Sequence, residues 1–187
     1  MEKKPHFRPE GFHTVNPYLV VKGAAGLLDF VRKAFGAEEV GQAFKGPDGA
    51  IMHAAVRIGD SIIEVGDSPG EPMPACLHMY VEDPDSTYRR AIQAGGTSLR
   101  EPETAFYGDR TAGVKDPCGN QWWLACRVED VSPEEMERRI KAHSRSHAGS
   151  ASAKLSRLWK TRALSPDNYF TMIRSSRTAD KRRRTLM

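Results

Sequence analysis

Several segments of this chain combine the alternating polarity of β-strands with side chains that bind ligands or exchange protons. In each segment, one alternate set is apolar, and we expect it to face a helix while the other set faces a cleft. The cleft set contains the residues with chemistry, namely Asn16, Tyr18, His53, Arg57, Glu64, Cys76, His78, Tyr80 and Trp123. Aromatic walls with a few convergent polar groups are typical of a small-molecule site.

Each candidate also has a structural interpretation. A strand histidine such as His53 is commonly an ordinary hydrogen-bonded residue, and Glu64 has Arg57 as a candidate ion-pair partner. Cys76 is expected to be a small buried thiol, because no neighbouring residue marks it as activated. Tyr107 and Arg110 either close the mouth of the cleft or anchor their own loop. These alternatives stay open on the sequence alone.

The elements that must position these residues occur twice. The first set is a strand, a helix and three strands, over Asn16–Val21, Ala24–Phe35, Val40–Phe44, Ala50–Ile58 and Ser61–Val65. The second set has the same order, over Cys76–Val81, Pro84–Ala94, Thr97–Leu99, Arg110–Lys115 and Gln121–Ala125. Within the first set, we expect Met52, Ala54, Val56 and Ile58 to face the helix.

An offset of 60 residues superimposes the two sets, placing Val21 on Val81, Gly36 on Gly96 and Gly59 on Gly119. Such a repeat indicates an internal duplication. The sequence therefore predicts an α+β fold of two tandem β-α-β-β-β modules, residues 16–67 and 75–127, with the free faces of their sheets around one concave cleft.

The rest of the chain divides by composition. Residues 1–15 form a polar lead-in, and residues 128–141 contain a short helix that begins after Ser132 with a capping box. Residues 1–137 hold 14 Lys+Arg and 22 Asp+Glu, a net charge of −8, whereas residues 138–187 hold 14 and 2, a net charge of +12. We expect residues 142–187 to be a disordered basic tail that binds polyanions non-specifically.

The cellular compartment can be predicted from features that the sequence lacks. No apolar run approaches the roughly 20 residues that cross a bilayer, and the N-terminus has no hydrophobic signal segment. The three cysteines have no zinc-site spacing. We therefore expect a cytoplasmic protein with reduced thiols and no membrane partner.

Five stretches together carry a family resemblance: NPYLVV, DFVRKAFGAEEV, HAAVRIGDSIIEVGD, LHMYVEDPDSTYRRAIQAGG and YGDRTAGVKDPCGNQWWLA. Over residues 16–127 the chain resembles the vicinal oxygen chelate superfamily, which comprises glyoxalases, bleomycin-resistance proteins and extradiol dioxygenases. The PhnB-like branch is the nearest likeness. The resemblance implies the same two-module fold and a homodimer.

The resemblance also raises the question of a metal. Metal-dependent members use four positions, which correspond here to Asn16, Glu64, Cys76 and Trp123, and only Glu64 keeps a usual ligand. A rearranged site of His53, Glu64 and His78 would supply two histidines and a carboxylate for one divalent ion.

Two functions follow as alternatives. In an enzyme (a lyase, isomerase or dioxygenase), Glu64 and His78 would be catalytic, with His53 as their partner and Arg57 or Arg110 binding an anionic group. In a metal-free drug-sequestering protein of the antibiotic-resistance type, Tyr18, Tyr80 and Trp123 would stack on a planar ligand. Tyr107 belongs to the expected ligand-binding set in both.

Overall fold

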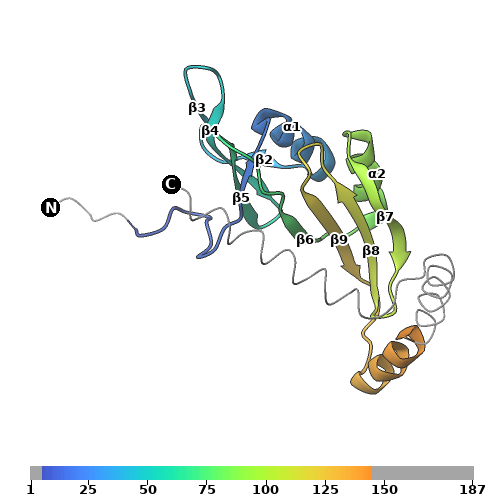
Figure 1. Ribbon diagram of the computed structural model, residues 1–187. Coiled ribbons are helices and arrows are strands. Elements are labelled where there is room, and N and C mark those ends of the chain that lie inside the picture. The colour runs from blue at the N-terminus through green and yellow to red at the C-terminus, as the bar shows by residue number, and fades with distance from the viewer. Residues whose placement is uncertain (1–5, 145–187) are drawn as a thin grey trace, which may run out of the picture. The chain divides into compact units, whose positions relative to one another are not determined.

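The structure is a computed structural model in which residues 6–144 are described. The chain divides into two units, Met1–Ser132 and Pro133–Met187, and each is treated by itself. The first unit contains two sheets and two helices (Figure 1).

The first module forms a five-stranded sheet with strand order β1-β5-β4-β2, in which β3 also pairs with β4. β1 runs parallel to β5, and the other pairs are antiparallel. Its elements are β1 (Tyr18–Val21), α1 (Ala24–Phe35), β2 (Glu38–Glu39), β3 (Phe44–Lys45), β4 (Ile51–Ile58) and β5 (Ser61–Asp67).

The second module repeats this plan in a four-stranded sheet of order β6-β9-β8-β7, again with its first and last strands parallel. Its elements are β6 (Cys76–Tyr80), α2 (Pro84–Gln93), β7 (Thr97–Thr104), β8 (Asp109–Lys115) and β9 (Gln121–Arg127). α1 and α2 start 60 residues apart, as do β5 and β9. The predicted duplication and α+β fold class are confirmed.

The helices begin and end where the sequence predicts. Asp83 caps α2 by accepting a hydrogen bond from the Ser86 N–H at 2.9 Å, and Pro84 occupies the first turn. α1 ends at Gly36, whose φ of 68° suits a residue without a side chain.

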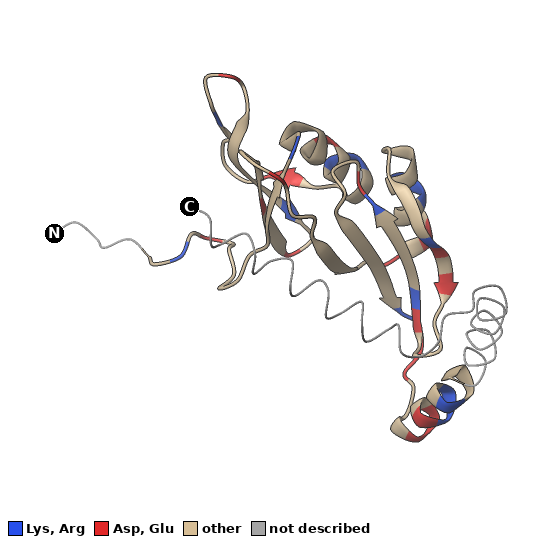
Figure 2. Ribbon diagram, viewed as in Figure 1, with Lys and Arg blue, Asp and Glu red and all other residues tan. Residues whose placement is uncertain are grey.

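α1 and α2 pack side by side, and the main core lies between them and one side of each sheet (Figure 1). Trp122 of β9 is buried against Phe35 of α1, with ring centroids 4.8 Å apart, so this contact joins the modules. The other side of each sheet, called its free face below, has no helix on it within the described part of the first unit. In Figure 2, β6 and most of β9 are uncharged.

Alternation along β4 breaks at one residue. Met52 was expected on the helix side, but its relative exposure is 65%. Phe44 pairs with His53 and Lys45 with Ile51, which leaves Met52 as the extra residue of a β-bulge. Because a bulge changes which residues share a face, Ile51 takes the core place that Met52 was predicted to fill.

Two other boundaries differ from expectation. The strand predicted over Val40–Phe44 is not formed as such: β2 ends before it, and β3 overlaps it only at Phe44. β7 continues to Thr104 instead of ending at Leu99. Alternation is weak in both stretches, so hydrophobic pattern does not define their ends.

The described part of the second unit is a helix over residues 133–144. Its beginning agrees with the capping box predicted at Ser132. Glu135 forms ion pairs with Arg138 and Arg139. The predicted tail over residues 142–187 lies outside the described residues from 145 onward. Across residues 6–144, no helix is long and apolar enough to cross a membrane.

Candidate functional site

A histidine–carboxylate pair lies on the free face of the first sheet. His53 Nε2 and Glu64 Oε1 are 3.0 Å apart, and their side chains are 39% and 29% exposed. Arg57, the partner that we considered for Glu64, forms no ion pair with it among the described residues, and His53 takes that place. We call these two residues the His53–Glu64 pair.

Strand register explains how the two side chains meet. Glu64 of β5 lies opposite Ala55 of β4. His53 is two residues before Ala55, so its side chain projects from the same face as that of Glu64, and the two are diagonal neighbours. On the other side of β5, the parallel register places Tyr18 opposite Glu64. The first sheet therefore aligns Tyr18, Glu64 and His53 across three strands.

Aromatic rings flank the pair. The His53 ring lies 6.1 Å from the Tyr18 ring and 6.4 Å from the Phe44 ring, measured between centroids. The Tyr18 hydroxyl donates to the Met52 carbonyl at 3.3 Å, which requires its ring to cross Gly66. A Cβ on Gly66 would come within 2.6 Å of the Tyr18 hydroxyl oxygen, so only glycine permits this arrangement.

The lead-in covers part of this face. A hollow of about 420 Å³ lies over the His53–Glu64 pair, and the rest of its lining comes from the lead-in and the start of the first module: Phe7, Arg8, Pro9, Phe12, His13, Thr14 and Asn16. A side chain at Gly11 would lie 3.4 Å from the Arg57 guanidinium. We call this space the dyad hollow.

Sequence reasoning did not anticipate this cover. Its one signal was two phenylalanines, Phe7 and Phe12, in an otherwise polar segment. Asn16 was assigned to an inherited metal position. Its amide instead closes a local turn, accepting from the His13 N–H at 3.0 Å and donating to the His13 carbonyl at 2.9 Å.

The free face of the second sheet carries the other candidates. Cys76, His78 and Tyr80 of β6 are exposed, with the His78 and Tyr80 rings 5.1 Å apart. Cys76 is therefore not the buried thiol that we expected. Trp123 packs on Gly113, and the Arg100 guanidinium lies 5.3 Å from its ring centroid.

Arg110 anchors an element and does not reach a cleft. It forms a two-pronged ion pair with Asp85 of α2 at 2.7 and 2.8 Å, on the helix side of β8. The Arg110 guanidinium lowers the pKa of the Asp85 carboxyl. Tyr107 contacts Phe106 edge-on in the loop before β8. Of the two roles left open for Arg110, the structure supports the anchor.

The structure does not bring the three predicted metal ligands together. His53 and Glu64 line the dyad hollow, whereas His78 lines a larger cavity between the modules. Within residues 6–144, no group of three or more His, Cys, Asp or Glu side chains is arranged to hold a metal ion. Within the described residues, His53, Glu64 and His78 therefore do not form the expected three-ligand site.

The solved structures that match are similar in fold alone. TioX from Micromonospora sp. ML1 is 19% identical with a TM-score of 0.50, over 61% of this chain and 99% of that one. A gene product of Arabidopsis thaliana is 21% identical with a TM-score of 0.51, over 62% and 99% of the two chains.

A relative found by sequence comparison has a higher sequence identity than these structures. A protein of Mycobacterium tuberculosis, strain H37Rv, described as uncharacterised, is 36% identical over 136 residues, which are 66% of this chain and 79% of the relative. A family model matches residues 11–124, which span both modules and the end of the lead-in. The chain thus belongs to the Glyoxalase/Bleomycin resistance protein/Dioxygenase superfamily.

Proposed function

We propose that this chain binds a small oxygenated or aromatic molecule in the dyad hollow, without a metal ion. The observation that carries the proposal is the His53–Glu64 hydrogen bond at 3.0 Å, half-buried between two aromatic rings and open to a hollow. Small-molecule sites have this composition of apolar walls and a few fixed polar groups.

The pair has hydrogen-bonding capacity left for a ligand. When His53 Nε2–H donates to Glu64 Oε1, Nδ1 remains an acceptor, and no other residue of the described chain bonds to it. The second oxygen of Glu64 is a further acceptor. Phe7 and Phe12 line the hollow and can pack against a planar ligand, so a molecule with a hydroxyl or N–H group on an aromatic ring fits best.

Proton transfer is a second candidate, favoured by the same hydrogen bond. His53 Nδ1 would take a proton from an O–H or C–H group of the ligand, and Glu64 would stabilise the imidazolium that forms. This corresponds to a lyase or isomerase of the superfamily. We assign no step to a metal ion, because His53 and Glu64 have no third ligand beside them among residues 6–144.

The proposal is tested with Glu64→Gln, which keeps the shape of the side chain and removes its charge. Glu39→Gln is the matched control, because Glu39 is exposed on β2, away from the dyad hollow. A panel of phenols, aromatic amines and hydroxy acids is screened by thermal shift against all three proteins. Compounds that stabilise wild type and Glu39→Gln should fail with Glu64→Gln.

Equal shifts for Glu64→Gln and wild type would refute the site. Elemental analysis of the purified protein separates the two chemistries. A stoichiometric divalent metal that disappears in Glu64→Gln would refute the metal-free form of the proposal.

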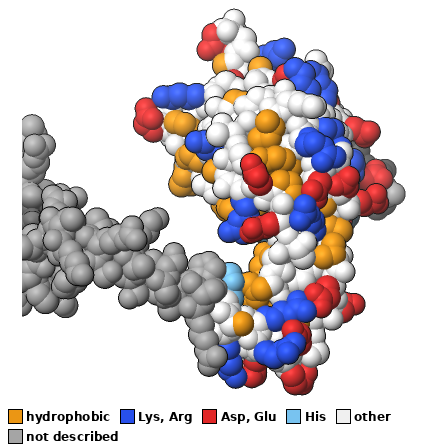
Figure 3. Space-filling model, turned by 90° about the vertical axis from the view of Figure 1, so that its right-hand side faces the viewer, with side chains coloured by type: hydrophobic (Ala, Val, Ile, Leu, Met, Phe, Trp, Pro, Cys, Tyr) orange, Lys and Arg blue, Asp and Glu red, His pale blue; other side chains and the backbone are white. Residues whose placement is uncertain are grey.

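We also propose a cytoplasmic homodimer of the PhnB-like branch. Support comes from the exposed aromatic residues of the free faces, including Tyr80 and Phe44, and from the unpaired edge strands. Figure 3 shows acidic and basic side chains interspersed on one side of the molecule, so this side carries no single-sign field that would oppose pairing. Light scattering that shows only monomer at micromolar concentration would count against the dimer.

A further inference from the structure

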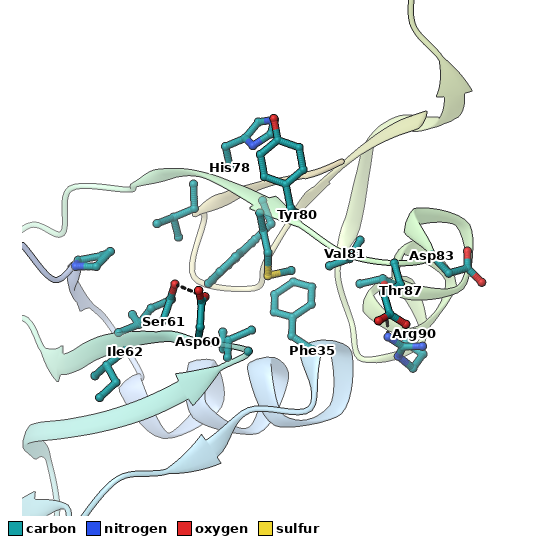
Figure 4. Close-up of a pocket in the computed structure, with 18 of the residues that line it drawn as sticks. Phe35, Asp60, Ser61, Ile62, His78, Tyr80, Val81, Asp83, Thr87 and Arg90 are labelled. Atoms are coloured by element: carbon teal, nitrogen blue, oxygen red, sulfur yellow. Dashed lines mark hydrogen bonds between the residues drawn. The ribbon is translucent and has the colours of Figure 1, made fainter. Parts of the chain in front are cut away.

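A cavity of about 810 Å³ lies where the two modules meet, and we call it the seam cavity. Its walls are the β4–β5 turn, the end of β6, the start of α2 and Phe35 at the end of α1 (Figure 4). It shares only His13 with the dyad hollow. Ligand sites typically measure 300–1,000 Å³, so this space suits a drug-sized molecule better than a protein segment.

The floor of the seam cavity is apolar and aromatic. Phe35 projects into it in Figure 4. The Trp122 ring, which also lines the cavity, packs against Phe35 at 4.8 Å between ring centroids. Met79 and Ile63 add apolar surface, and Tyr80 stands at one edge. Aromatic faces carry negative partial charge, which attracts organic cations as well as flat apolar rings.

The rim is acidic. Asp60, Glu82 and Asp83 all line the cavity and are exposed. Asp60 accepts from the Ser61 hydroxyl at 3.1 Å and Asp83 accepts from the Ser86 N–H, but neither has a cationic partner in the described chain, nor has Glu82. The lining therefore contains three acidic residues without ion pairs among the described residues, although the Asp83 carboxylate is used to cap α2.

Among the described residues, Arg90 is the one Lys or Arg that lines the seam cavity, and hydrogen bonds to the wall hold its guanidinium. It donates to the Ala34 carbonyl at 3.2 Å, the Thr87 hydroxyl at 3.0 Å and the Ser86 hydroxyl at 3.3 Å. Three negative charges against one positive charge leave the lining with a net charge of −2 when His13 and His78 are neutral.

We propose that the seam cavity binds a small organic cation, a protonated or quaternary amine attached to a flat aromatic body. The rings lie on Phe35 and Met79, and the cationic nitrogen is held between the carboxylates of Asp60 and Glu82. The site is separate from the dyad hollow, so its occupation does not require the His53–Glu64 pair.

The test uses two probes of nearly the same shape. N-methylacridinium is a permanent cation, and acridine is uncharged at mildly alkaline pH. Fluorescence titration of wild type should give tighter binding of the cation. The double variant Asp60→Asn/Glu82→Gln should bind N-methylacridinium about 10-fold more weakly and acridine equally well, because two exposed charges each contribute modestly.

Two controls locate the effect. Glu38→Gln/Glu101→Gln removes the same charge from exposed positions outside the seam cavity and should leave both titrations unchanged. Glu64→Gln should also leave them unchanged, which separates this site from the proposed function. Ser61→Phe, on the rim, should block both probes while far-UV circular dichroism stays native.

The proposal is overturned by any of three results. These are equal affinity of wild type for the two probes, equal loss of N-methylacridinium binding in both double variants, and undiminished binding by Ser61→Phe.

Discussion

The two modules share a parallel pairing of their first and last strands, but positions paired in the same way carry different chemistry. In the first module, Tyr18 of β1 lies opposite Glu64 of β5. In the second, His78, which is 60 residues after Tyr18, lies opposite Trp123 of β9. The place of the charged Glu64 is thus taken by the apolar ring of Trp123.

The neighbouring strands extend this comparison. Glu64 lies opposite Ala55, and Trp123 lies opposite Gly113. Two residues before Ala55 and Gly113 are His53 and Thr111, and Thr111 is buried with no hydrogen-bond partner for its hydroxyl among the described residues. The first free face therefore has a polar pair able to act on a ligand, whereas the second has an aromatic surface.

The turns before the last strands differ as well. In the second module, the buried Asp116 accepts four hydrogen bonds, from the N–H groups of Cys118 and Asn120, the Asn120 amide and the Trp122 indole. In the first module, the β4–β5 turn contains Gly59 and the exposed Asp60. The carboxylate that accepts several hydrogen bonds in the first module is Asp67, at the end of β5 and outside this turn. It accepts from the N–H groups of Gly23, Ala24 and Ile51.

The largest expected effect tests this difference between turns. Asp116→Ala should lower the free energy of unfolding by about 3–5 kcal/mol, because it leaves several buried donors unpaired. Asp60→Ala should change it by less than about 1 kcal/mol, because Asp60 is exposed. Urea unfolding at neutral pH measures both. Similar losses for the two variants would mean that the turns are equivalent in stability.

The next effect concerns ligand binding by the two free faces. Glu64→Gln should weaken any ligand of the dyad hollow by about 10-fold or more, since it removes one charge-assisted acceptor. His78→Ala should have a smaller effect, although the sequence placed both residues in one site, because His78 lines the seam cavity instead. Cys76→Ser and Cys118→Ser should have none. Isothermal titration with a hit from the panel gives the ranking, and a larger loss for His78→Ala would reverse the assignment.

Much of this architecture follows from short-range pattern. The 60-residue repeat, the Asp83 cap and the helix ends at Gly36 and Gly95 depend on local chemistry, so the sequence predicts them. The apolar sets of β5 and β9 face the helices as alternation requires. The bulge at Met52 was missed because an extra residue leaves no mark in composition.

The site was only partly predictable. Alternation selects which residues share a face, and it correctly placed His53 with Glu64 on one face and His78 with Trp123 on another. It does not say how two sheets are oriented to each other, so the expected trio with His78 was not assembled. It also says nothing of the lead-in over Arg57, which is a contact between residues far apart in sequence.

A smaller effect on the free energy of unfolding is expected at acidic pH, and it comes from Asp67 in the first module. Hydrogen bonds from the N–H groups of Ala24, Ile51 and Gly23 lower the pKa of Asp67 in the folded protein. A lowered folded pKa stabilises the fold above the unfolded pKa near 4, and this stabilisation is lost as the pH falls through the folded pKa.

Asp67→Asn should therefore lower stability by about 2 kcal/mol at neutral pH and reduce the acid dependence of unfolding below about pH 4. Asp48→Asn is the control, because Asp48 lies in the exposed turn before β4 and accepts from one N–H, that of Ala50. If the free energy of unfolding of Asp67→Asn and of wild type fell equally with pH below about pH 4, the Asp67 carboxylate would not support the β1–α1 connection.

The smallest expected effect concerns Trp123 on the free face of the second module. The measurement asks whether Arg100 already covers its ring in the absence of a ligand. Arg100 lies over Trp123 at 5.3 Å, and its Nη1 is also 3.5 Å from a carboxylate oxygen of Glu103. An exposed cation–π contact contributes about 0.5–1 kcal/mol, and an exposed ion pair contributes about as much or less.

Arg100→Gln removes both contacts, whereas Glu103→Gln removes only the second. A double-mutant cycle of Arg100→Gln with Trp123→Leu should give a coupling energy of about 0.5 kcal/mol, and Glu103→Gln with Trp123→Leu should give none. A coupling near zero in the first cycle would leave the Trp123 ring open to stack on a ligand, and the second free face would then be a binding surface comparable to the first.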